Sequence, residues 1–299
     1  MISDITLGYL ILLLPLFSFV VNGLFLGNCK AKAAAAFAIA CNGLAAVSAI
    51  IIAIHYFCSD FAPQKAILFE YAFIPFAGEL VAKIGMLIDP LSTMMLVVVT
   101  FISLMVNIYS VGYMREDRAE GRFFALLSLF SFSMLGLVVA TNLFQMFIFW
   151  ELVGVSSYLL IGFWYHKPSA VSASKQAFIL TRFADSFFLL GIVLVSYVVG
   201  SFDFSTLNEL SLGAFKSSAI NLGLCTVSRA DALILGSIMI FTGGWGKSAM
   251  FPMHIWLPNA MEGPTPVSSI IHSATMASRR MLSLDNVKYA TVFVRVSII

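Results

Sequence analysis

The chain has 299 residues, of which 60% are hydrophobic and only 11% are charged, and its net charge at pH 7 is +2. Soluble domains carry about 25% charged residues, so this composition excludes a soluble protein and indicates a polytopic membrane protein with the lipid bilayer as its surroundings. The weak net charge and the lack of a basic cluster interleaved with aromatic residues indicate no nucleic acid partner.

The apolar runs predict an all-α fold, a polytopic transmembrane helix bundle. A helix needs about 20 apolar residues to cross a hydrocarbon core of about 30 Å. Seven runs approach or exceed that length, and none alternates with the two-residue period of a membrane barrel. They are Leu7–Leu26, Ala33–Phe57, Met86–Val106, Phe123–Ala140, Leu143–Phe163, Ala177–Gly200 and Ala230–Phe251. An eighth, incomplete run extends from Pro264 to Met276 and is too short to cross.

The loops and helix ends add two predictions. Lysine and arginine dominate the first, third and fifth loops, which indicates that these loops face the cytoplasm or the matrix. Asp89 and Pro90 stand near the start of the third run, where this pair is typical of a helix end. The composition changes at residue 277. The segment 277–299 carries five charged residues and is too polar to complete a span. We expect a truncated or frameshifted carboxy-terminal end.

Glu151 lies near the middle of an apolar run that is otherwise free of charge. A carboxylate at that depth costs about 2.5–3.5 kcal/mol on insertion scales, so it indicates a function in charge transfer. The alternative is a structural ion pair between two helices.

Lys247 follows Gly243, Gly244 and Gly246 and precedes Pro252, which predicts a seventh helix that breaks beside the lysine, as at the ion sites of transporters. The alternative is a lysine that extends to the membrane interface.

Three further residues join this set of candidates. Arg182 and Asp185 are three residues apart on one helix and can pair with each other, either as a structural pair or to tune Glu151. His272 lies in the segment SSIIHSAT, whose hydroxyl groups can order water. We expect either proton transfer through its imidazole or a hydrogen-bonded packing role. No second histidine follows at helical spacing, so no metal site is expected.

Three blocks carry a resemblance to a known family. They are FWELVGVSSYLLIGFW at 149–164, KQAFILTRFADSFFLLGI at 175–192 and GKSAMFPMHIWLPNAMEGPTPVSSIIHSATM at 246–276. They closely resemble subunit L of the proton-translocating NADH-quinone oxidoreductase (complex I), which is subunit 5 in mitochondria. The resemblance implies two inverted repeats, each with a broken helix. It also implies that Glu151 and Lys247 form the ion pair of a proton half-channel, influenced by Arg182 and Asp185 and continued by His272.

The resemblance also implies the organisation of the chain. Residues 1–122 hold the first three helices, residues 123–276 hold the first antiporter-like repeat with its last helix incomplete, and residues 277–299 form an atypical charged tail. A second repeat is expected on a separate polypeptide, if it exists. The chain would be a subunit of the NADH:quinone oxidoreductase translocase, with other membrane subunits of complex I as partners. NAD, FMN, iron–sulfur clusters and quinone (ubiquinone) would bind to other subunits, and no cofactor is expected in this chain.

Two other functions remain open at this point. One is the large subunit of a multisubunit sodium/proton antiporter, which has a similar scaffold, although the blocks SSYLLIGFW and TRFAD favour the respiratory subunit. The other is a non-functional truncated remnant. The alanine-rich second run and the lack of a transit peptide favour the bacterial inner membrane, with the mitochondrial inner membrane as the alternative.

Overall fold

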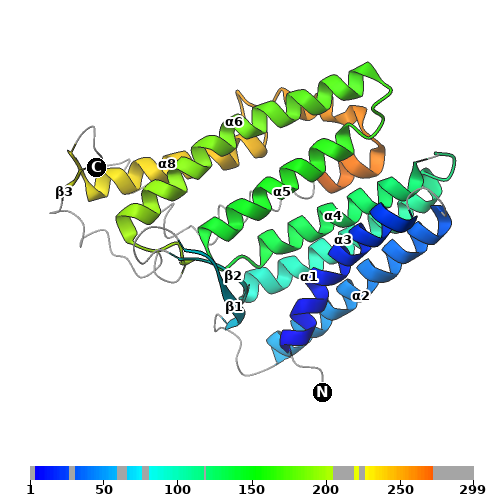
Figure 1. The fold of residues 1–299 in the computed structure, drawn as a ribbon, viewed down its shortest axis with the longest axis horizontal. Coiled ribbons are helices and arrows are strands. Elements are labelled where there is room, and N and C mark those ends of the chain that lie inside the picture. Colours follow the sequence, from blue (N-terminus) through cyan, green and yellow to red (C-terminus); the bar gives the residue numbers. More distant parts are fainter. Residues whose placement is uncertain are drawn as a thin grey trace.

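The protein is a bundle of long helices in a computed structural model that describes residues 4–26, 31–58, 66–75, 81–117, 119–204, 219–221 and 226–271. Figure 1 shows the helices α1 to α6 side by side, with the strands β1 and β2 at one end of the bundle. The long helices are α1 (Asp4–Val21), α2 (Ala31–Cys58), α3 (Pro90–Tyr113), α4 (Glu120–Val138), α5 (Leu143–Ile161), α6 (Pro168–Val199) and α8 (Arg229–Lys247). A short π-helical turn, Asn22–Leu26, continues α1.

Six helices within the described ranges are long and apolar enough to cross a membrane, and they correspond to the first six predicted runs. The protein is therefore a mostly helical, multi-pass membrane protein. The predicted seventh run forms α8, which is not among the six. A charged first turn and a glycine-rich end lower the hydropathy of α8. Of the predicted eighth run, residues 265–271 are helical, and the remainder lies outside the described residues.

The prediction of an all-α fold is wrong in one respect, because the chain also forms two small antiparallel sheets. Strand β1 (Ala66–Pro75) pairs with β2 (Val81–Ile88), and β3 (Ala219–Asn221) pairs with β4 (Thr226–Ser228). Met86, predicted to begin the third span, therefore belongs to a strand. Its run is apolar because β2 is partly buried against the bundle, and an apolar strand and an apolar helix are alike over a few residues.

The third helix begins where Asp89 and Pro90 stand, so the predicted helix-end role of this pair is confirmed. The Asp89 carboxylate accepts a hydrogen bond from the backbone N–H of Ser92 at 2.6 Å. The Ser92 hydroxyl in return accepts one from the backbone N–H of Asp89 at 2.8 Å. This reciprocal capping satisfies two donors that the helix leaves open, and Pro90 occupies the first turn, where its missing N–H costs nothing.

The hairpin is fixed to the start of α5 by the amide of Gln145. The backbone N–H of Gly85 donates to Gln145 Oε1 at 3.0 Å, and Gln145 Nε2 donates to the carbonyl of Gly85 at 2.8 Å. The neighbouring Asn142 donates from Nδ2 to the carbonyl of Lys83 at 2.7 Å. Asn142 also caps α5, because its side chain accepts from the backbone N–H of Gln145. Hairpin and helix start are therefore held as one unit.

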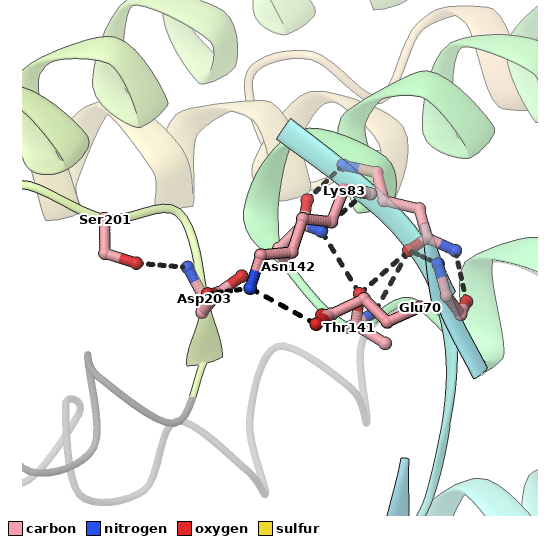
Figure 2. Close-up of polar contacts among 8 residues, drawn as sticks. Glu70, Lys83, Thr141, Asn142, Ser201 and Asp203 are labelled. Atoms are coloured by element: carbon pink, nitrogen blue, oxygen red, sulfur yellow. Dashed lines mark hydrogen bonds and ion pairs between the residues drawn. The ribbon is translucent and has the colours of Figure 1, made fainter. Parts of the chain in front are cut away.

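A second set of contacts extends this unit to the segment after α6. Figure 2 shows the ammonium of Lys83 between the carboxylates of Glu70 and Asp203, and each N···O distance is 3.2 Å. The hydrogen bond to Asp203 makes the largest contribution and raises the pKa of Lys83 above its ordinary value. Burial opposes this increase, and the hydrogen bond to Glu70 adds to it by a smaller amount than burial removes. The end of the bundle that carries the hairpin is thus linked to α5 and to the end of α6.

Helix α4 forms the centre of the bundle, and most of its residues are buried. It contacts α1, α2, α3 and α5. Buried serines join it to its neighbours: the Ser18 and Ser128 hydroxyls are 2.9 Å apart, and the hydroxyls of Ser103 and Ser131 are also in contact. Such hydrogen bonds between helices stabilise packing where no water competes.

Helices α6 and α8 pack closely because glycines line their interface. A Cβ atom on Gly191 would lie 2.6 Å from the carbonyl oxygen of Gly236, and one on Gly243 would lie 2.5 Å from the side chain of Phe188. Distances that short leave no room for a side chain, so the two backbones are in direct contact. This approach brings Lys247, the last residue of α8, against α5 and α6.

Candidate functional site

Glu151 lies in the middle of α5 and contacts Arg182 of α6. The two side chains form an ion pair between the Glu151 carboxylate and the Arg182 guanidinium. Arg182 Nη2 also donates a hydrogen bond to the backbone carbonyl of Glu151 at 2.9 Å, and its guanidinium lies 4.7 Å from the ring centre of Phe178. Both charged side chains are largely buried, with 22% of Glu151 and 25% of Arg182 exposed. The pair ties α5 to α6 at mid-helix depth.

Lys247 ends α8 and is buried, with 6% of its surface exposed. Its ammonium donates a hydrogen bond to the backbone carbonyl of Trp150 at 2.6 Å and lies 5.1 Å from the centre of the Trp150 indole ring. As predicted, the helix ends at this lysine, with Ser248 as its cap, and the chain continues in turns to the short helices α9 (Trp256–Asn259) and η3 (Ala260–Glu262). A lysine buried in this way does not extend to an interface.

Asp185 is also buried, with 1% exposed, and its carboxylate accepts a hydrogen bond from the indole N–H of Trp150 at 2.7 Å. Its other oxygen, Oδ2, has no hydrogen-bond partner among the described residues. The expected pair between Arg182 and Asp185 is therefore not the arrangement that the structure has. Arg182 extends across to Glu151, and Asp185 binds the tryptophan, because α5 offers a better-placed partner to each than their own helix does.

Gly154 allows the two cations to approach the same turn of α5. A Cβ atom at this position would lie 3.0 Å from Arg182 Nη2 and 3.1 Å from Lys247 Nζ. The resemblance implies a direct pair between Glu151 and Lys247. In the structure Glu151 pairs with Arg182 instead, and no ion pair among the described residues includes Lys247. Glu151 and Lys247 nevertheless belong to one cluster, because Lys247 and Arg182, the partner of Glu151, both approach Gly154.

A small cavity adjoins this cluster. It has a volume of about 20 Å³, which is enough for one water molecule. Lys247 lines it together with three residues that carry hydroxyl groups, Ser157, Tyr158 and Thr181. The cavity lining therefore contains groups of the kind that hold a buried water molecule.

Two of the contacting residues, Trp150 and Gly154, are not among those selected from the sequence. Both stand in the block FWELVG beside Glu151, and the only sequence signal for them is this proximity. His272, which is among the predicted site residues, lies outside the described residues. Within the described ranges no group of three or more histidine, cysteine, aspartate or glutamate side chains could hold a metal ion.

A buried acid–base cluster among long apolar helices, one of which ends at its lysine, defines an antiporter-like membrane protein. The fold agrees with a solved structure, a chain of the membrane-bound sulfane sulfur reductase, an archaeal respiratory membrane complex. The TM-score is 0.77 over 94% of this chain and 53% of that one, at 18% sequence identity. At that identity the likeness shows the fold alone.

Family comparisons identify the chain further. Residues 140–295 match the family described as NADH:quinone oxidoreductase/Mrp antiporter, TM, and residues 73–124 match the family described as NADH-ubiquinone oxidoreductase (complex I), chain 5 N-terminus. The chain belongs to this family and corresponds to the amino-terminal portion of the chain 5 (subunit L) group, which confirms the resemblance. The first match extends to residue 295 and so includes part of the charged segment 277–299.

Curated relatives agree with this assignment. The chain is 50% identical over 202 residues to NAD(P)H-quinone oxidoreductase chain 5 of Synechocystis sp., covering 68% of this chain and 28% of that protein. It is 51% identical over 201 residues to the chloroplastic subunit 5 of Anthoceros angustus, and 44% identical over 230 residues to that of Marchantia polymorpha. Those matches cover 67% and 77% of this chain, and the chain spans 26% and 32% of the length of these two relatives.

Proposed function

We propose that this chain forms part of the proton-translocating membrane subunit of an NAD(P)H-quinone oxidoreductase. One observation carries the proposal: the ammonium of Lys247 is buried between helices and has no carboxylate as an ion-pair partner among the described residues. A buried charge without such a partner is costly, and a purely structural role would be served better by an apolar side chain. A lysine that gains and loses a proton requires this kind of environment.

The geometry suggests how the cluster acts. Arg182 Nη2 and Lys247 Nζ approach the same side of Gly154, so a small movement of the Glu151 side chain would transfer it from one cation to the other. With Glu151 beside it, the lysine holds its proton more firmly; with Glu151 on Arg182, it releases the proton more readily. The water-sized cavity beside Lys247 offers a route for the proton. Asp185 and Arg182 set the field in which this exchange occurs.

The proposal includes the finer architecture and the partners. We assign α8 as a seventh crossing, broken at Lys247, and the helix that begins at residue 265 as the start of an eighth. Residues 1–122 and 123–276 then form the amino-terminal helices and the first antiporter-like repeat. The partners are other membrane subunits of the complex and a second repeat. NAD, FMN, iron–sulfur clusters and quinone bind to other subunits. The relatives come from a cyanobacterium and from chloroplasts, which favours a bacterial or chloroplast membrane over a mitochondrial one.

Replacement of Glu151 by Gln and of Lys247 by Ala, each in the intact complex, tests this function. We expect both variants to retain oxidation of NAD(P)H by quinone to a large extent and to lose most of the coupled proton translocation, measured with a pH-sensitive dye in membrane vesicles. The matched controls are Glu116→Gln and Lys175→Ala, because both side chains are exposed, Glu116 in the turn after α3 and Lys175 on α6. Normal translocation in both site variants would contradict the proposal.

The family description also names the Mrp antiporters, so sodium/proton exchange is the second candidate. The relatives of about 50% identity carry the name of the oxidoreductase, which favours the first candidate. Vesicles that contain the complex decide between the two. Translocation driven by NAD(P)H in sodium-free buffer supports the oxidoreductase, whereas exchange driven by a sodium gradient without NAD(P)H supports the antiporter.

A further inference from the structure

Trp150 contacts both Asp185 and Lys247. Its indole N–H donates to Asp185 on α6 at 2.7 Å, and its backbone carbonyl accepts from Lys247 on α8 at 2.6 Å. The face of its ring lies 5.1 Å from the Lys247 ammonium, within the range of a cation–π interaction. The acid and the base are thus joined through a single residue of α5, and neither has a direct ion pair with the other among the described residues.

The indole is buried and contacts both α6 and α8. Trp150 is 2% exposed, and its ring packs edge-on against Phe188 of α6 at a centroid distance of 5.3 Å. A tryptophan whose only task is to fill space would need a partner for its N–H but would not need to contact a charge on each of two neighbouring helices. Among the residues that the structure describes, Asp185 Oδ2 has no hydrogen-bond partner, so the hydrogen bond from the indole N–H to Oδ1 fixes the orientation of this carboxylate.

We propose that Trp150 is a positioning residue that couples Asp185 to Lys247. The indole holds the carboxylate at a fixed distance from the ammonium, while the carbonyl and ring hold the ammonium in place. A change in the charge or position of Asp185, or of its neighbour Arg182, then alters the position of the Lys247 ammonium through this one residue. This inference rests on the proposed function, because it requires that the protonation of Lys247 matters for translocation.

The chain contains a matched control for this tryptophan. Trp164 also donates its indole N–H to a carboxylate, Asp117 Oδ2 at 2.9 Å, and its ring also lies close to a lysine ammonium, that of Lys167 at 4.3 Å. This second set lies at the end of the helices, outside the cluster around Gly154. A Trp→Phe substitution therefore removes the same type of hydrogen bond at both positions, but only Trp150 is joined to the proposed relay.

The test is a double-mutant cycle in the intact complex, with proton translocation per NAD(P)H oxidised as the readout. We expect Trp150→Phe to lower translocation roughly tenfold, the scale expected for loss of a hydrogen bond to a charged group. If the indole acts through Asp185, the double variant of Trp150→Phe with Asp185→Asn is no worse than Asp185→Asn alone. Trp164→Phe is expected to translocate as the unmodified complex does.

Several outcomes would overturn the coupling. Additive losses in the double variant, normal translocation in Trp150→Phe, or an equal loss in Trp164→Phe would each do so. If Trp150→Phe fails to assemble, benzothienylalanine at the same position replaces the indole N–H by sulfur with almost the same shape, and normal translocation then contradicts the proposal. Normal translocation in both Glu151→Gln and Lys247→Ala overturns the proposed function itself, whereas a loss in these variants with normal translocation in Trp150→Phe overturns only the coupling.

Discussion

Gly154→Ala is a sharp test of the cluster, because it adds a single methyl group between the two cations. That methyl carbon would lie 3.0 Å from Arg182 Nη2 and 3.1 Å from Lys247 Nζ. Both distances are shorter than an ordinary contact, so each side chain must move by a few tenths of an ångström. The clashing atoms are the ends of long flexible side chains and not backbone atoms. The fold should therefore tolerate the change while the cluster does not.

The expected result is assembly without loss of stability but with reduced proton translocation. The Lys247 ammonium is held at 2.6 Å by the Trp150 carbonyl, and a shift of a few tenths of an ångström weakens that hydrogen bond without removing it. Weakening a charge-assisted hydrogen bond without breaking it costs about 1 kcal/mol of its free energy, which predicts a roughly fivefold loss of translocation. Oxidation of NAD(P)H, measured in the same vesicles, should change much less.

Two other glycines provide the controls for this experiment. A Cβ on Gly112 would meet no atom within 4 Å, so Gly112→Ala should behave as the unmodified complex does. Gly191→Ala should instead impair assembly, because its Cβ would lie 2.6 Å from the backbone oxygen of Gly236, which cannot move aside cheaply. If Gly154→Ala translocates normally, or fails to assemble as Gly191→Ala does, the reasoning about the cluster is refuted.

Two further predictions concern the hairpin. Gln145→Leu removes both hydrogen bonds to the backbone of Gly85 and should lower the free energy of unfolding by about 2 kcal/mol, seen as a lower thermal midpoint in detergent. The control, Gln176→Leu, loses one exposed hydrogen bond and should change the thermal midpoint little. Equal shifts in the two variants would contradict the argument. The second prediction concerns Lys83, whose pKa is raised chiefly by the hydrogen bond to Asp203. Its ion pairs therefore contribute fully to the stability of the fold at pH values below the ordinary pKa of 10.5. This stability is lost as the pH rises through the raised pKa. The effect is small because the side chains are partly exposed, and Lys83→Met should abolish this alkaline step in the thermal midpoint.

Much of the fold follows from local properties of the sequence. Six of the predicted spans correspond to helices because an apolar run of about 20 residues has few alternatives in a membrane. The start of α3 follows from Asp89 and Pro90, whose roles depend only on residues within one turn. The hairpin β1–β2 was not predicted, because its residues become a strand through pairing and through the contacts of Gln145, which is 60 residues away from Gly85.

The candidate site, like the fold, could be predicted only in part from the sequence. Charges within apolar runs are visible in the sequence, so Glu151, Arg182 and Asp185 could be selected from it. Lys247 could be selected because glycines and a proline surround it at the end of its run, and the structure brings all four residues together around α5. Their partners could not be selected. The pairing of Arg182 with Glu151 instead of Asp185 depends on how α5 and α6 are rotated against each other.

The sequence by itself determined that this is a multi-pass membrane protein with acids and bases inside its apolar runs, because hydrophobicity and charge are properties of each residue alone. Only the tertiary structure decided which groups meet. Lys247 binds a backbone carbonyl, and every residue has such a carbonyl, so no residue type could mark Trp150 as its acceptor. The close packing of α6 on α8 through glycines sets the position of that lysine, and packing of this kind is a property of pairs of helices.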